Sequence, residues 1–119
     1  MKKINLGFVG AGFNGQLIHI ANYHKLNNCI LLAIAEPRKK IRKLVAKRYG
    51  IKNQYDNHVD LIKYQKDLDA VIIVTKRQLL GPIALDFLKK NISILVEKPM
   101  AGNITQASRL IKSWNKNNT

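Results

Sequence analysis

Cysteines, acidic residues and long apolar runs are all scarce in this chain of 119 residues. Cys29 is the single cysteine, which excludes an intrachain disulfide and a zinc cluster built from cysteines. No apolar run approaches the roughly 20 residues that cross a bilayer, so we expect no membrane segment. Glycines interrupt the apolar stretch after Met1 and no small-residue cleavage site follows it, so we expect a cytoplasmic protein.

The scarcity of acidic residues leaves a large positive charge. Seven Asp and Glu stand against 21 Lys and Arg, which gives a formal net charge of +14. Such a surplus indicates a polyanionic partner such as nucleic acid, the phosphates of a nucleotide cofactor, or a longer protein that balances the charge elsewhere. No metal site is expected, because His19 and His24 lie five residues apart and His58 is isolated.

Short apolar runs alternate with amphipathic stretches along the chain. The apolar runs predict strands at Ile4–Val9, Cys29–Ala35, Ile51–Asn53, Asp69–Thr75 and Ile92–Val96. Helical spacing predicts helices at about Asn14–Leu26, Arg38–Tyr49, Asn57–Tyr64, Pro82–Lys90 and Asn103–Trp114, with Trp114 interpreted as a core residue. Because the strands are near-continuous Val, Ile and Leu, they suit a parallel sheet covered on both faces. We therefore predict a doubly wound α/β domain with five strands in the order 3-2-1-4-5.

A glycine-rich turn follows the first predicted strand and opens the first predicted helix. It reads Gly10-Ala11-Gly12-Phe13-Asn14-Gly15 and fits G-x-G-x-x-G. In this motif the first glycine permits a tight turn, the second lets the backbone approach a pyrophosphate, and the third lets the helix pack on the sheet. Free N–H groups at the helix start attract the phosphates. The context predicts a dinucleotide site.

The choice of dinucleotide depends on Glu36, 21 residues beyond Gly15 at the end of the next strand. A carboxylate there accepts hydrogen bonds from the adenosine ribose hydroxyls and repels a 2′-phosphate, which favours NAD. The basic run Arg38-Lys39-Lys40 follows directly and could pair with that phosphate, so NADP stays an alternative.

Three segments together resemble the Gfo/Idh/MocA oxidoreductases, which include glucose–fructose oxidoreductase and inositol dehydrogenase. They are Gly7–Gly15, Asp69–Thr75 and, most specifically, Glu97-Lys98-Pro99-Met100-Ala101. The resemblance covers nearly the whole chain. It implies an NAD(P)-dependent enzyme that transfers hydride to or from a sugar, a cyclitol or a related small carbinol.

The resemblance also implies roles for individual residues. Lys98 would lie beside the nicotinamide ribose and the substrate hydroxyl as the catalytic residue, and an ammonium group there could stabilise an alkoxide. The resemblance and the glycine-rich turn together assign cofactor binding to ten residues. These are Gly10, Gly12, Phe13, Asn14, Gly15, Glu36, Arg38, Thr75, Glu97 and Lys98.

The chain departs from the family pattern in two ways. After the fourth strand the family commonly has Thr-Pro-Asn-x-x-His, whereas here Lys76 replaces the proline and Leu80 stands at the histidine position. The family also continues into a second domain that supplies the substrate contacts, further acid/base residues and much of the oligomer interface. We therefore expect residues 1–119 to form only the NAD(P)-binding domain, to be inactive alone, and to belong to a homo-oligomeric full-length protein.

A second hypothesis comes from the segment between Arg38 and Tyr49, which carries seven basic residues. Such a helix could track a phosphate backbone, in a Rossmann module that binds nucleic acid or senses NAD without redox chemistry. No groove-reading motif or basic tail accompanies the helix, so we do not expect nucleic acid to be the partner.

Overall fold

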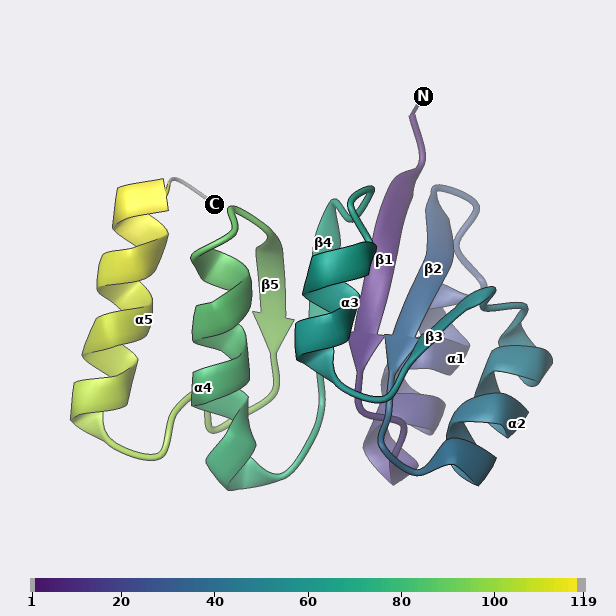
Figure 1. The fold of residues 1–119 in the computed structure, drawn as a ribbon, viewed down its shortest axis with the longest axis horizontal. Coiled ribbons are helices and arrows are strands. Elements are labelled where there is room, and N and C mark those ends of the chain that lie inside the picture. Colours follow the sequence, from purple (N-terminus) through teal and green to yellow (C-terminus); the bar gives the residue numbers. More distant parts are fainter. Residues whose placement is uncertain (1, 118–119) are drawn as a thin grey trace.

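A computed structural model describes residues 2–117 and shows five parallel strands with helices on both sides (Figure 1). The strands are β1 (Ile4–Val9), β2 (Cys29–Ala35), β3 (Asn53–Tyr55), β4 (Ala70–Ile73) and β5 (Ser93–Val96). The helical segments are η1 (Gly15–Ile20), α1 (Ala21–Tyr23), α2 (Lys39–Tyr49), α3 (His58–Tyr64), α4 (Arg77–Leu88) and α5 (Ile104–Asn117). The sheet order is β3-β2-β1-β4-β5, which confirms the predicted fold class and strand order.

The sheet has two apolar cores, one on either face, and β1, β2 and β4 contribute side chains to both. Along β4, Val71 and Ile73 point into one core and Ile72 into the other, as the alternation of side chains in a strand requires. The first core includes Leu61 and Phe87 and lies under α3, α4 and α5. The second contains residues of η1 and α2, and in Figure 1 α1 lies behind the sheet while α3 lies in front of it. This two-sided burial explains the continuous apolar strands.

Two predicted element boundaries were wrong. The third strand begins at Asn53, where its pairing with Ala33 starts, rather than at Ile51. Ile51 instead closes the end of α2, where its N–H donates to the Ala46 carbonyl at 2.9 Å and its side chain is buried. The fourth long helix begins at Arg77, so Pro82 lies inside α4 instead of opening it. Burial of Leu80 and other apolar side chains before and after the proline keeps this turn helical despite the missing N–H.

The first and last helices also differ from expectation. The helix after the glycine turn is π-helical over Gly15–Ile20 and ends at Tyr23 instead of near Leu26. The last helix is capped as predicted by Asn103, whose side-chain oxygen accepts the Gln106 N–H at 2.9 Å. Trp114 was wrongly predicted to be a core residue, because its side chain is 52% exposed. Within residues 2–117 no helix is both long and apolar enough to span a membrane.

Candidate functional site

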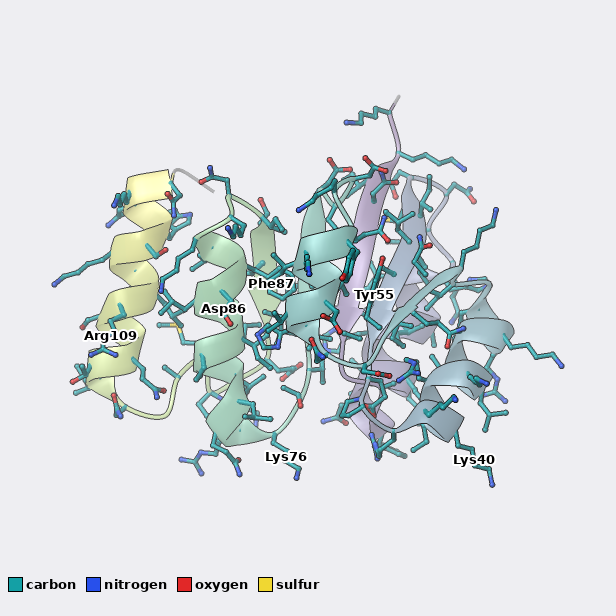
Figure 2. All side chains as sticks on the ribbon, viewed as in Figure 1. Lys40, Tyr55, Lys76, Asp86, Phe87 and Arg109 are labelled. Atoms are coloured by element: carbon teal, nitrogen blue, oxygen red, sulfur yellow. The ribbon has the colours of Figure 1, made fainter. Side chains whose placement is uncertain are left out.

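A cleft of about 880 Å³ opens where β1, β2 and β4 end. Parallel strands all present their carboxyl ends at one edge of the sheet, which is the edge where open α/β folds bind ligands. In Figure 2 the side chains of Lys40 and Lys76 project from this edge. The cleft is lined by Gly10, Ala11, Gly12, Phe13, Asn14, Gly15, Glu36, Pro37, Arg38, Val74, Thr75, Lys76 and Leu79. Eight of the ten residues predicted for the site are therefore together in one cleft, and Glu97 and Lys98 are not among its lining residues.

Two glycines in the turn are required by the protein's own packing. Gly10 has a φ of +98°, and a Cβ there would stand 1.9 Å from the Val74 carbonyl oxygen. A Cβ at Gly15 would lie 2.9 Å from the Gly10 carbonyl oxygen. The turn and the helix that follows it are thus folded tightly against the ends of β1 and β4, and this brings the start of the helix to the cleft.

Gly12 is different, because the protein leaves space beside it. A Cβ at this position would have only the Arg38 guanidinium within 4 Å, at 3.9 Å, and would enter the cleft. Packing within residues 2–117 therefore does not require glycine here. A ligand that approaches the backbone closely does require it, and the pyrophosphate of a dinucleotide is such a ligand. The cleft fits that cofactor at this point.

The helix start beside Gly12 also suits an anion. Helical backbone begins at Phe13, and the Asn14 side chain makes no capping hydrogen bond. The first N–H groups of a helix have no partner within the helix and carry its positive dipole end. Gln16 supports the turn, since its side-chain amide donates to the Ala11 carbonyl at 2.7 Å. Phosphate oxygens in the cleft would face these N–H groups.

Glu36 is held by two arginines at the end of β2. Its side chain is buried, and its Oε1 accepts a hydrogen bond from Arg38 Nε at 2.7 Å and a second contact from Arg38 Nη2. Arg42 Nη1 donates to the Glu36 carbonyl at 2.7 Å and also pairs with Asp56 at 2.7 Å. The guanidinium of Arg38 therefore stands beside the predicted ribose position, between Glu36 and Gly12.

The sequence analysis missed the role of Arg42. Sequence reasoning groups it with the seven basic residues that could track a phosphate backbone, but it is buried and bound to Glu36 and Asp56. Its Nε is buried without a hydrogen-bond partner among the described residues. Arg42 is therefore unavailable to a phosphate backbone, which weakens the second hypothesis. Its position six residues after Glu36 is compatible with many helical contacts, so spacing alone could not have identified it.

Glu97 and Lys98 form the turn that leaves β5, and the Lys98–Pro99 peptide bond is cis. The Glu97 carboxylate accepts a hydrogen bond from His19 Nε2 at 2.9 Å and one from the Lys98 backbone N–H at 3.2 Å. The bond from His19 is the main cause that lowers the pKa of Glu97 below its usual range, so Glu97 is ionised at neutral pH. The Lys98 side chain is exposed.

His19 was also missed, because it was read only as a possible metal ligand. The fourth position after Gly15 carries no chemical signal by itself, and Glu97 lies 78 residues away in the sequence. Leu80, in contrast, has no part in the cleft, since its side chain is buried in the core under α4. Thr75 is partly buried in the cleft wall after β4.

The parallel sheet, the glycine turn and the acidic residue after β2 define the class of the protein as a dinucleotide-binding α/β domain. Residues 4–119 match the model of the oxidoreductase family with an NAD-binding Rossmann fold, Gfo/Idh/MocA. The chain belongs to this family and is its NAD-binding Rossmann domain, which confirms the resemblance inferred from the Glu-Lys-Pro element.

The similar proteins include inositol dehydrogenases and other dehydrogenases. The chain is 28% identical over 113 residues to inositol 2-dehydrogenase from Rubrobacter xylanophilus, a match that covers 94% of this chain and 32% of that protein. Its fold superposes with a TM-score of 0.90 on scyllo-inositol dehydrogenase from Lactobacillus casei with bound NAD(H) and scyllo-inositol, at 23% identity over 98% of this chain and 34% of that one. The TM-score is 0.92, at 22% identity, for the WlbA dehydrogenase from Chromobacterium violaceum in complex with NADH and UDP-GlcNAcA, with 100% of this chain and 34% of that one covered. The chain thus spans about a third of the length of these relatives.

Proposed function

We propose that the cleft binds NAD with the pyrophosphate against Gly12 and the helix start, and with the adenosine ribose toward Glu36. The observation that carries this proposal is the open space beside Gly12, where the protein's own packing does not require a glycine. The uncapped N–H groups after Phe13 would hold the phosphate oxygens, and the buried Glu36 would accept ribose hydroxyls.

Calorimetry with NAD tests this assignment. The wild-type chain should bind NAD, whereas Gly12→Val should lose measurable affinity because its side chain occupies the space of the pyrophosphate. Gly102→Val serves as a matched control outside the cleft, where the nearest atom to a new Cβ is the end of the flexible Gln106 side chain. The assignment is wrong if Gly12→Val folds normally and binds NAD as tightly as the wild type and the control.

The Glu36–Arg38 pair would set the preference between NAD and NADP. Arg38 is bound to Glu36 and stands beside the cleft, so a 2′-phosphate could draw its guanidinium away from the carboxylate. Arg38→Ala should weaken NADP binding more than NAD binding, and Glu36→Ala should weaken NAD binding more than NADP binding. Equal effects of both changes on both dinucleotides would contradict this account of the pocket.

The reaction we propose is hydride transfer between NAD and a carbinol of a cyclitol or sugar, as the names of the relatives suggest. Bound NAD would supply the hydride acceptor. The Lys98 ammonium, at the carboxyl end of β5, would stabilise the alkoxide and take part in moving the hydroxyl proton. Substrate contacts would come from a second domain, since the relatives are about three times as long as this chain.

The exposed surface beside β5 supports a further domain. Ile104, Ile111 and Trp114 are 85%, 50% and 52% exposed on α5, and β5 lies at the edge of the sheet. Without a second domain the substrate would not be held against the cofactor, and positioning accounts for roughly 7–11 kcal/mol of such barriers. The 119-residue chain should therefore bind NAD and yet produce no NADH from a panel of polyols and sugars. Turnover that depends on Lys98 would show that the chain already holds the catalytic machinery.

A further inference from the structure

One side-chain hydrogen bond joins the helix of the glycine turn to the turn that carries Lys98. His19 lies in η1, within the first helix, and Glu97 directly follows β5. Their side chains meet at 2.9 Å, from His19 Nε2 to Glu97 Oε1. The contact is largely shielded from water, since the two side chains are 11% and 30% exposed.

Three hydrogen bonds hold the Glu97–Lys98 turn. The Glu97 N–H donates to the Ile73 carbonyl at 3.0 Å, which ties the backbone to the end of β4. Glu97 Oε1 is held by His19, and Oε2 accepts the Lys98 N–H at 3.2 Å. The carboxylate therefore connects the backbone of Lys98 to a side chain of the first helix.

The His19–Glu97 contact differs in exposure and in position from the other contacts between acidic and basic side chains. An exposed pair contributes little, as expected for Lys2 and Asp69, whose side chains are 84% and 36% exposed. His58 and Asp86 join α3 to α4, far from the cleft residues. Only the His19–Glu97 pair, among those within residues 2–117, ends beside the residue to which the Glu-Lys-Pro element assigns catalysis.

We infer that His19 is a positioning residue, which holds the Glu97–Lys98 turn through the Glu97 carboxylate and couples it to the helix that binds the cofactor phosphates. The role of Lys98 in this inference rests on the proposed function, whereas the coupling itself is a property of the fold. Movement of the first helix when the dinucleotide binds would be transmitted to Lys98 by this contact. The charged groups that act on the Glu97 carboxylate are His19 from the first helix and Lys98 from its own turn.

The test compares three single variants with the wild-type chain. His19→Ala removes the donor, and His19→Gln keeps an N–H donor on a side chain of similar length. His24→Gln is the matched control directly after the same helix, since His24 contacts the Tyr49 ring and is not bonded to Glu97. Two measurements need no cofactor: the pKa of the Glu97 carboxyl from its NMR titration, and the hydrogen-exchange rate of the Lys98 backbone amide.

We expect the three variants to change the Glu97 pKa and the Lys98 exchange rate to different degrees. In His19→Ala the Glu97 pKa should rise toward about 4.3, the ordinary value for Glu, and the Lys98 amide should exchange up to about tenfold faster. His19→Gln should restore most of both properties, and His24→Gln should leave both unchanged. If His19→Ala does not fold, Glu97→Gln removes the carboxylate on the other side of the contact and should also speed exchange at Lys98.

Coupling to the cofactor is measured separately. Addition of NAD to the wild type, with its lysines labelled by reductive ¹³C-methylation, should shift the Lys98 resonance, and His19→Ala should reduce that shift while the chain still binds NAD. If the Lys98 amide exchanges at the wild-type rate in both His19→Ala and Glu97→Gln, the positioning role is refuted. An NAD-induced shift of the same size in His19→Ala refutes the coupling. A wild-type chain that does not bind NAD refutes the proposed function instead, and the exchange rates still decide the role of His19.

Discussion

The two ends of the nucleotide-binding edge are built in different ways. At the β1–β2 end, Gly10 touches the backbone of Val74 so closely that no side chain fits, and Glu36 is buried between Arg38 and Arg42. At the β5 end, Lys98 is exposed and Ile104 is 85% exposed. The first end is formed by close contacts within the domain, whereas the second leaves side chains of the turn after β5 and of α5 exposed.

The ligands proposed for the two ends account for this difference. A pyrophosphate is recognised by backbone N–H groups, which need a fixed turn and no side chain in the way. A reacting carbinol is recognised by side chains, which in a family of longer proteins can come from another part of the molecule. Mutations at the two ends should therefore change stability by different amounts.

The largest effect is expected at Gly10. Gly10→Ala adds a Cβ that would lie 1.9 Å from a backbone oxygen, at a φ of +98°, so the turn must move. We expect a loss of about 4 kcal/mol or more in the free energy of unfolding, measured by urea denaturation. Gly50→Ala is the control, since Gly50 also has a positive φ, +68°, but a new Cβ meets nothing within 4 Å. It should cost only about 1–2 kcal/mol, and an equal loss in both variants would mean that the Val74 contact is unimportant.

A smaller effect is expected at the β5 end, where Leu110 is the one buried side chain among the described residues of α5. Leu110→Ala should lower the free energy of unfolding by about 2–4 kcal/mol, because Leu110 is 5% exposed and packs in the core under α4. Ile104→Ala on the same helix should change it by less than about 0.5 kcal/mol. Similar losses in both variants would show that the exposed face of α5 is packed in solution, for example against a second copy of the chain.

The cap of α5 should contribute less again. Asn103→Ala removes the side-chain oxygen that accepts the Gln106 N–H, and about 1 kcal/mol of unfolding free energy should be lost. Asn115→Ala, inside the same helix, removes no cap and should be neutral or slightly stabilising. The pair of denaturation curves shows whether the cap acts as the geometry indicates.

The sequence predicted the fold well because its signals are local and periodic. Continuous apolar strands can be buried only between two layers of helices, and the glycine turn can be placed because it follows a strand and opens a helix. The boundaries of β3 and α4 were missed where tertiary burial of Ile51 and Leu80 overrode the local signals. Arg42 and His19 were missed for another reason. Arg42 binds Asp56, which belongs to no motif, and His19 binds Glu97, which lies 78 residues away in the sequence. Both contacts exist only in the folded chain.

The smallest effect concerns pH and the His19–Glu97 pair. Because the folded pKa of Glu97 is lowered, the pair stabilises the fold above the unfolded pKa of Glu, about 4.3, and this contribution is lost as the pH falls through the folded pKa. The wild type should be more stable than Glu97→Gln at pH 7, and the difference should shrink as the pH falls below about 5. Asp67→Asn is a suitable control, since the Asp67 side chain makes no ion pair within residues 2–117. A difference between wild type and Glu97→Gln that stays constant over this pH range would mean that the carboxylate charge does not stabilise the β5 end.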